Sequence, residues 1–158
     1  MKKYELTKET KVIGGKTLFR IRALRSFGDI KAGDLGGFIE NERNLSHEGN
    51  AWVSGDARVD GDARVDGDAW VDGNAQVSGD GLINSNNDYL CEKGLGSHNR
   101  SASFFKCKDG HIHVLCGCFD GNLDEFENKV KKEHGNSKYA KEYLGFIEVV
   151  KTHFEVCQ

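Results

Sequence analysis

The residues best suited to metal chemistry are cysteines and histidines between positions 107 and 118. This stretch contains Cys107, His111, His113, Cys116 and Cys118. Thiolate and imidazole are ligands that zinc prefers, so a zinc site is the first hypothesis. In an extended strand, however, Cys116 and Cys118 face one way while His111 and His113 face the other. The single residue between Cys116 and Cys118 is also shorter than the usual gap between paired zinc ligands. We therefore expect small buried cysteines, with no metal and no other cofactor.

Residues for catalysis are no better placed. Cys116 and Cys118 have apolar neighbours, and no acid occupies an evident position to orient a base beside them. No glycine-rich phosphate loop of the Walker type occurs. The sequence therefore predicts no catalytic residues and a protein that is not an enzyme.

Arginine and tryptophan side chains could instead bind a small anionic ligand. A guanidinium forms two parallel hydrogen bonds to a phosphate, and an indole ring can stack on a base. The candidate ligand-binding residues are Arg20, Arg22, Arg25, Trp52, Arg58, Arg64 and Trp70. Two alternatives remain open: the arginines pair with nearby aspartates or only face solvent, and the flanking segments cover the tryptophans.

A six-residue repeat in the middle of the chain would position several of these side chains. A valine or isoleucine recurs at 53, 59, 65, 71, 77 and 83, with a small residue four positions after each of the first five and glycine at 55, 61, 67, 73 and 79. This pattern is typical of a hexapeptide-repeat parallel β-helix, in which three hexads make one turn. The aliphatic residues fill the interior, and glycine supplies the conformation of the corners. Hairpins with Asp-Gly turns are the alternative, but nothing in them requires a period of six.

A turn of eighteen residues predicts which residues are neighbours in adjacent coils. Trp52 should pair with Trp70, Arg58 with Gln76 and Arg64 with Leu82. Only about two coils fit between residues 47 and 82, so both ends need covering. His47 occupies a position where valine would face inward, and we expect it to be an end-cap residue rather than a general base.

The flanking segments complete a four-part prediction. We expect an N-terminal β cap over residues 1–46, the β-helix over 47–88, a linker over 89–100 and a ββαα module over 101–158. In that module Asp109-Gly110 predicts a type I′ hairpin with Lys108 opposite His111. Asn122 and Ser137 should cap two helices, and Gly135 should end the first.

Composition places the chain among globular proteins. Its 158 residues have a net charge of -3 and 30% charged residues, which does not favour duplex nucleic acid as a partner. No run of residues approaches the length of a membrane span, and no apolar stretch follows the lysines of residues 1–10, so we expect a cytoplasmic protein without a signal peptide. The odd set of five cysteines is then expected to be reduced.

Two long segments carry a family resemblance. "RIRALRSFGDIKAGDLGGFIENERNLSHEGNAWV" (residues 20–53) and "CGCFDGNLDEFENKVKKEHGNSKYAKEYLGFIEVVKTHF" (residues 116–154) resemble the two ends of mostly uncharacterised phage and prophage hexapeptide-repeat proteins. The resemblance implies a left-handed β-helix and a phage origin, hence the cytoplasm of the host cell. It implies no established activity for particular residues.

The fold class expected is therefore mainly β: a short left-handed parallel β-helix with an N-terminal β cap and a C-terminal α+β module. Such proteins commonly trimerise along the coil faces, so we expect a homo-oligomer, with a trimer favoured. The leading functional hypothesis is a non-enzymatic binding protein that sequesters a small anionic nucleotide, an immune signal of the host. The alternatives are a scaffold or adaptor that binds a host or phage protein, and a hexapeptide-repeat acyltransferase.

Overall fold

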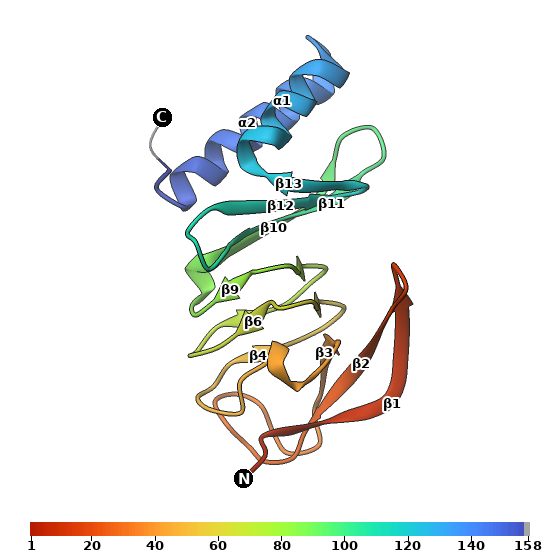
Figure 1. The fold of residues 1–158 in the computed structure, drawn as a ribbon, viewed down its shortest axis with the longest axis vertical. Helices are drawn as coiled ribbons and strands as arrows, with labels where there is room; N and C mark the ends of the chain where they lie inside the picture. The colour runs from red at the N-terminus through yellow and green to blue at the C-terminus, as the bar shows by residue number, and fades with distance from the viewer. Residues whose placement is uncertain (157–158) are drawn as a thin grey trace. The chain divides into compact units, whose positions relative to one another are not determined.

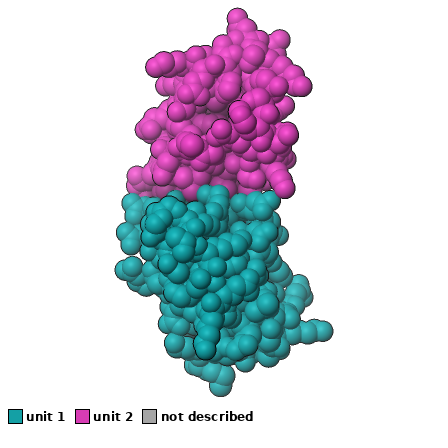
Figure 2. Space-filling view, turned by 90° about the vertical axis from the view of Figure 1, so that its right-hand side faces the viewer, with its two compact units in different colours: residues 1–86 teal, residues 87–158 magenta. Residues whose placement is uncertain are grey.

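The computed structural model describes residues 1–156, so Cys157 lies outside the described part of the chain. The protein is mainly β with two helices near the C-terminus (Figure 1). It divides into two compact units, residues Met1–Asn86 and Asn87–Gln158, which we call the N-terminal and C-terminal units (Figure 2). Neither helix in residues 1–156 has the length and apolar character needed to cross a membrane.

The N-terminal unit begins with an antiparallel hairpin. Strand β1 (Tyr4–Ile13) pairs with β2 (Lys16–Ala23), and β2 pairs with β3 (Leu35–Ile39). Strand β3 then pairs in parallel with β5 (Arg58–Val59), which pairs in parallel with β8 (Gln76–Val77). The resulting mixed sheet, in the order β1-β2-β3-β5-β8, joins the N-terminal hairpin to one side of the repeat segment.

The repeat segment, residues 53–83 with their flanking positions, forms two-residue strands that pair in parallel across eighteen residues. Strand β4 (Trp52–Val53) pairs with β7 (Trp70–Val71), and β6 (Arg64–Val65) pairs with β9 (Leu82–Ile83). The predicted neighbours are confirmed: Trp52 with Trp70, Arg58 with Gln76 and Arg64 with Leu82. We call this arrangement the coil, and its three rows of paired strands its walls.

The interior of the coil is built as the pattern predicts. The repeated valines, the alanines four residues later and Ile83 are all at most 1% exposed. The five repeated glycines have φ between 57° and 64°, a conformation that costs other residues about 1–2 kcal/mol. Two requirements together set the six-residue period: burial of the aliphatic row, and a glycine with positive φ at each corner.

The coil begins earlier than predicted, inside the segment assigned to the N-terminal β cap. Ile39 pairs with Val59 and Leu45 bridges to Val65, and both of these additional aliphatic residues are fully buried. The corner between them is a short 3-10 helix, η1 (Glu42–Asn44), without the repeated glycine and alanine. The side chain of Asn44 donates to the carbonyl oxygens of Gly61 and Ala63 instead. The place of the small residue, four positions after Ile39, holds Arg43, and the buried polar side chain at this corner is that of the next residue, Asn44, which hides the corner from a search for the repeat.

The C-terminal unit is an antiparallel sheet with helices. Its strands are β10 (Tyr89–Leu95), β11 (Arg100–Lys106), β12 (Ile112–Cys116) and β13 (Phe119–Asn122), in that order across the sheet. A second 3-10 helix, η2 (Asn86–Asp88), precedes β10. The prediction of a linker over residues 89–100 is wrong for most of its length, because β10 pairs with β11 along it. Its polar, glycine-containing composition concealed a strand in which only Leu95 is buried.

The β11–β12 hairpin differs from the prediction by one residue of register. Cys107, not Lys108, is opposite His111, because the Cys107 N–H donates to the His111 carbonyl at 2.9 Å. The Gly110 N–H donates to the Cys107 carbonyl, and Gly110 has φ 89°. This is a three-residue loop with a glycine bulge rather than the two-residue type I′ turn. Phe104 therefore pairs with Val114, and Phe105 with His113.

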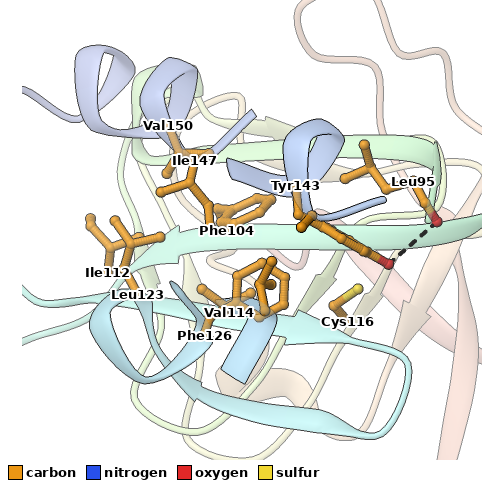
Figure 3. Packing of buried hydrophobic residues seen from close by; sticks show 13 residues of the cluster. Leu95, Phe104, Ile112, Val114, Cys116, Leu123, Phe126, Tyr143, Ile147 and Val150 are labelled. Atoms are coloured by element: carbon orange, nitrogen blue, oxygen red, sulfur yellow. Dashed lines mark hydrogen bonds between the residues drawn. The ribbon is translucent and has the colours of Figure 1, made fainter. Parts of the chain in front are cut away.

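The two helices follow the predicted limits closely. Helix α1 (Leu123–His134) is capped by the Asn122 side chain and ends at Gly135, and α2 (Lys138–His153) is capped by Ser137. Both bury apolar residues against the sheet in one hydrophobic cluster (Figure 3). Phe104 is at its centre, with ring contacts to Phe126 and Phe146.

Candidate functional site

The C-terminal unit contains a pocket of about 340 Å³ at one edge of the hydrophobic cluster. Phe126, Val130 and Tyr143 contribute its apolar surface, and Cys116 lies beside Tyr143 (Figure 3). The polar lining comes from the β10–β11 connection and from α1: Ser97, His98, Arg100, Lys129, Glu133 and His134. The pocket thus combines aromatic walls with several nitrogen donors, as small-molecule sites commonly do.

Arg100 is the residue of this pocket best suited to bind an anion. No carboxylate of residues 1–156 lies within ion-pair distance of its guanidinium, whereas Lys129 pairs with Glu133 at 3.5 Å. Gly117, with φ 59°, lies directly against the guanidinium, and a methyl group there would overlap it. The arginine is therefore placed by a glycine contact and keeps its donors for another group.

Tyr143 has a similar glycine contact, at the hydroxyl end of its ring. Its hydroxyl donates to the Leu95 carbonyl at 3.4 Å, and a methyl group at Gly96 would overlap the phenol. Burial raises the pKa of Tyr143 to about 12, and burial also raises the pKa of the Cys116 thiol. Both groups are consequently neutral near pH 7, so the positive charge of Arg100 is not cancelled by either of them.

The five arginines predicted to bind phosphate are mostly engaged within the N-terminal unit. Arg20 lies 2.9 Å from a Glu9 carboxylate oxygen and also donates to the Gly36 carbonyl. Arg22 pairs with Glu5, and Arg64 pairs with Asp66 at 3.1 Å. Most of these contacts correspond to the alternative in which the arginines pair with nearby carboxylates.

Arg25 and Arg58 have different surroundings. Arg25 donates to the His47 carbonyl at 3.3 Å and lies over the Phe27 ring. Arg58 is half-buried on the wall formed by β3, β5 and β8, and burial lowers its pKa. Arg58 is thus on a different wall from Arg64, which lies on the wall of β6 and β9.

The two tryptophans pair as predicted, but their exposure differs. Trp52 is 1% exposed, with edge contacts to Phe27 at 5.3 Å and Tyr4 at 6.5 Å. Trp70 is only partly buried. Trp52 therefore has no ring face for a base to stack on, because the N-terminal segment covers it; within this chain the stacking hypothesis is left to Trp70.

The predicted ligand-binding residues do not converge on one site within the chain. Arg58, Trp70 and Arg64 lie on three different walls of the coil. The sequence showed which residues share a wall but gave no reason for the walls to face a common ligand. Arg100 was missed because it fell in the predicted linker, and the contacts that place it come from Gly117.

His47 has the surroundings expected of a cap residue. Its ring stacks on Tyr4 with centroids 4.2 Å apart, and its Nδ1 accepts a hydrogen bond from the Lys3 backbone N–H. Burial lowers the pKa of His47. The inward position expected for His47 is taken by Leu45, which is fully buried.

The cysteines and histidines of the hairpin are arranged differently from the prediction. Cys116 packs in the hydrophobic cluster, away from His111 and His113, as expected. Cys107, however, joins the histidines: one ligand atom each of Cys107, His111 and His113 lies within 4.8 Å of the others. The changed hairpin register causes this, because the predicted pairing would have placed Cys107 opposite Ile112.

Comparison with known proteins adds no family to this description. No protein-family model matches the chain, and no curated protein matches its sequence.

Proposed function

We propose that this chain is a non-enzymatic binding protein that captures a small anionic ligand in the pocket of its C-terminal unit. The observation that carries the proposal is Arg100, whose guanidinium lines a pocket of about 340 Å³ and has no carboxylate of residues 1–156 within ion-pair distance. An arginine in such a setting is suited to a carboxylate or phosphate, since two of its N–H groups can bind both oxygens.

The aromatic lining favours an anion that also has an apolar or aromatic part. His134 stacks on Tyr143 with ring centroids 5.6 Å apart, and Phe119 contacts Phe126 at 5.1 Å. Such rings bind the flat face of a base, while the guanidinium binds the phosphate. These features support a small nucleotide as the specific ligand; sequestration of a host immune signal is the biological role we propose for its capture.

The proposal extends to the handedness of the coil, the origin of the protein and its oligomeric state. The coil is proposed to be a left-handed hexapeptide-repeat β-helix, and the chain a phage-encoded protein of the host-cell cytoplasm. A homo-oligomer is proposed as well, and Leu24 and Leu35, which are 46% and 57% exposed on the N-terminal unit, are apolar side chains that an interface would cover. A trimer along the coil walls is the arrangement proposed. Light scattering coupled to gel filtration measures the number of chains directly.

Calorimetry tests the ligand and its location together. The full chain is titrated with inorganic phosphate, AMP, cyclic nucleotides and ADP-ribose. At least one phosphate-containing compound should bind, and Arg100→Gln should weaken that binding by about 10- to 100-fold, since hydrogen bonds to charged groups contribute about 1.5–3 kcal/mol.

Arg58→Gln is the matched control, because it removes a half-buried arginine from a coil wall in the other unit. It should leave the affinity within about twofold. Heat that disappears in Arg58→Gln but persists in Arg100→Gln would move the site to the coil. A complete absence of heat for all four classes of ligand would remove the nucleotide proposal.

A further inference from the structure

A second group of chemically active side chains lies on the other face of the C-terminal sheet. Ile112, Val114 and Cys116 of β12 point into the hydrophobic cluster. His113 alternates with them and so faces away. His111 and Cys107 are opposite each other at the end of the hairpin, on the same face as His113. This group is therefore separate from the pocket that contains Arg100.

Two carboxylates determine which nitrogen of each histidine carries a hydrogen. Asp109 Oδ1 lies 2.5 Å from His111 Nδ1, and Asp120 Oδ1 lies 2.5 Å from His113 Nε2. A carboxylate accepts hydrogen bonds, so these two ring nitrogens are the donors. The Phe105 ring, with its centroid 5.4 Å from that of His113, further restricts the orientation of that histidine.

The remaining ring nitrogens are then left facing each other. His111 Nε2 and His113 Nδ1 are 3.3 Å apart. In the neutral rings both are lone-pair acceptors, so they cannot hydrogen-bond to each other, and they repel. A cation shared by the two nitrogens removes this repulsion: either a proton, which makes one ring an imidazolium, or a metal ion. The Cys107 sulfur, which lies within 4.8 Å of one ring nitrogen of each histidine, favours the metal ion.

We propose that Cys107 Sγ, His111 Nε2 and His113 Nδ1 bind a zinc ion. Nitrogens about 2.0–2.1 Å from zinc at the tetrahedral angle are about 3.3 Å from each other, which is the separation found. Sulfur and nitrogen in such a site are about 3.6 Å apart, and the Cys107 sulfur is within 4.8 Å of each histidine ligand atom, so each of these distances has to shorten by about 1.2 Å or less.

The surroundings of the three ligands agree with this assignment. Histidines that bind a metal almost always donate their other N–H to a carboxylate, carbonyl or water. Asp109 and Asp120 occupy these two positions here. A thiolate with two imidazoles selects zinc or a related metal of the late first row over magnesium and calcium, which prefer oxygen ligands. His111 is 40% exposed, so the fourth position is accessible to water.

Cobalt(II) is a suitable probe, because a thiolate bound to it gives a charge-transfer absorption that zinc then removes. The full chain is prepared without an affinity tag, stripped with a chelator, reduced and titrated with Co²⁺, followed by Zn²⁺. We expect one equivalent of Co²⁺ to produce the thiolate band and one equivalent of Zn²⁺ to abolish it. Calorimetry of Zn²⁺ alone gives the affinity.

Three variants locate the ligands. Cys107→Ser should remove the charge-transfer band, while Cys118→Ser, which alters an exposed thiol outside the cluster, should keep it. Asp120→Asn should weaken Zn²⁺ binding by about 10- to 100-fold, as loss of a carboxylate behind a histidine ligand commonly does. Because Asp120 is 68% exposed, this variant does not endanger the fold. The absence of a thiolate band in the wild-type chain would overturn the proposal, and so would an unchanged band in Cys107→Ser, which would place the metal elsewhere.

Discussion

Replacing single glycines of the coil by alanine tests how the coil is stacked, because otherwise equivalent glycines meet different neighbours. Gly67 and Gly73 occupy the same place in successive hexads, with φ 61° and 64°. A Cβ at Gly67 would lie 2.6 Å from the backbone carbonyl oxygen of Asn84 in the adjacent coil, whereas one at Gly73 would meet nothing within 4 Å. The two substitutions therefore share their conformational cost and differ in a single steric contact.

The expected magnitudes follow from these two contributions. The left-handed conformation costs alanine about 1–2 kcal/mol, and the lower entropy of the unfolded chain returns about 0.4–1 kcal/mol. Gly73→Ala should thus lower the free energy of unfolding by about 1 kcal/mol or less. At Gly67 the coils must also separate by several tenths of an ångström, beside the 2.8 Å hydrogen bond from Asp66 N–H to the Ile83 carbonyl. Overpacking of this kind adds about 1–3 kcal/mol.

Urea unfolding followed by tryptophan fluorescence measures this difference in the relevant unit, because both tryptophans of the chain lie in the N-terminal unit. With a slope of about 1.5 kcal/mol/M, a difference of 2 kcal/mol separates the two midpoints by about 1.3 M. Gly55→Ala is a third member of the series: its nearest neighbour would be at an ordinary 3.5 Å, so it should behave like Gly73→Ala. Equal midpoints for Gly67→Ala and Gly73→Ala would refute the stacking of residue 67 on residue 84.

Two further predictions concern the N-terminal unit. Val71→Ala should destabilise it by about 2 kcal/mol, because Val71 is fully buried in the coil, whereas Val12→Ala, at a position 71% exposed, should change the urea midpoint little. Burial lowers the pKa of Lys3, whose Nζ donates to the Ala51 carbonyl, to about 8, while the unfolded chain holds this proton to about pH 10.5. The unfolded state therefore binds more protons above pH 8, and the free energy of unfolding should rise by roughly 2 kcal/mol between pH 8 and 10 in the wild type but not in Lys3→Met. The comparison ends at pH 10 because burial also raises the pKa of Tyr4, which lowers the free energy of unfolding at higher pH. If the difference in free energy of unfolding between wild type and Lys3→Met did not change with pH, the lowered pKa of Lys3 would be contradicted.

The coil could be predicted in register because each of its positions has a local requirement. Val59, Ala63 and Gly61 each repeat a residue type that one place in the coil demands, so the eighteen-residue neighbours follow from counting. The earlier corner at Asn44 could not be found in this way. Its amide meets the carbonyls of Gly61 and Ala63, residues that lie 17 and 19 positions away. Only the folded chain shows these side-chain hydrogen bonds at the corner.

Exposure of the outer residues was less predictable than pairing, because it depends on segments far away in sequence. Trp52 and Trp70 have the same position in the repeat and pair with each other. Trp52 is nevertheless covered by Tyr4 and Phe27, which no periodicity relates to it. The candidate pocket depends on such a contact too, since Gly117, which follows the neighbouring strand β12, lies against the Arg100 guanidinium. Sites assembled from such contacts cannot be derived from spacing alone.

The hairpin shows why a small error of register has a large effect on chemistry. An Asp-Gly pair fits a two-residue turn, and it also fits the end of a three-residue loop with a glycine bulge. The choice shifts the pairing of β11 and β12 by one residue, and a shift of one exchanges the side chains that share a face across the hairpin. With Lys108 opposite His111, Cys107 would share a face with Ile112; with Cys107 opposite His111, its thiol joins two histidines. Whether Cys107 lies beside Ile112 or beside the two histidines therefore depends on Asp109, which does not have the positive φ that a type I′ turn requires at both of its central residues.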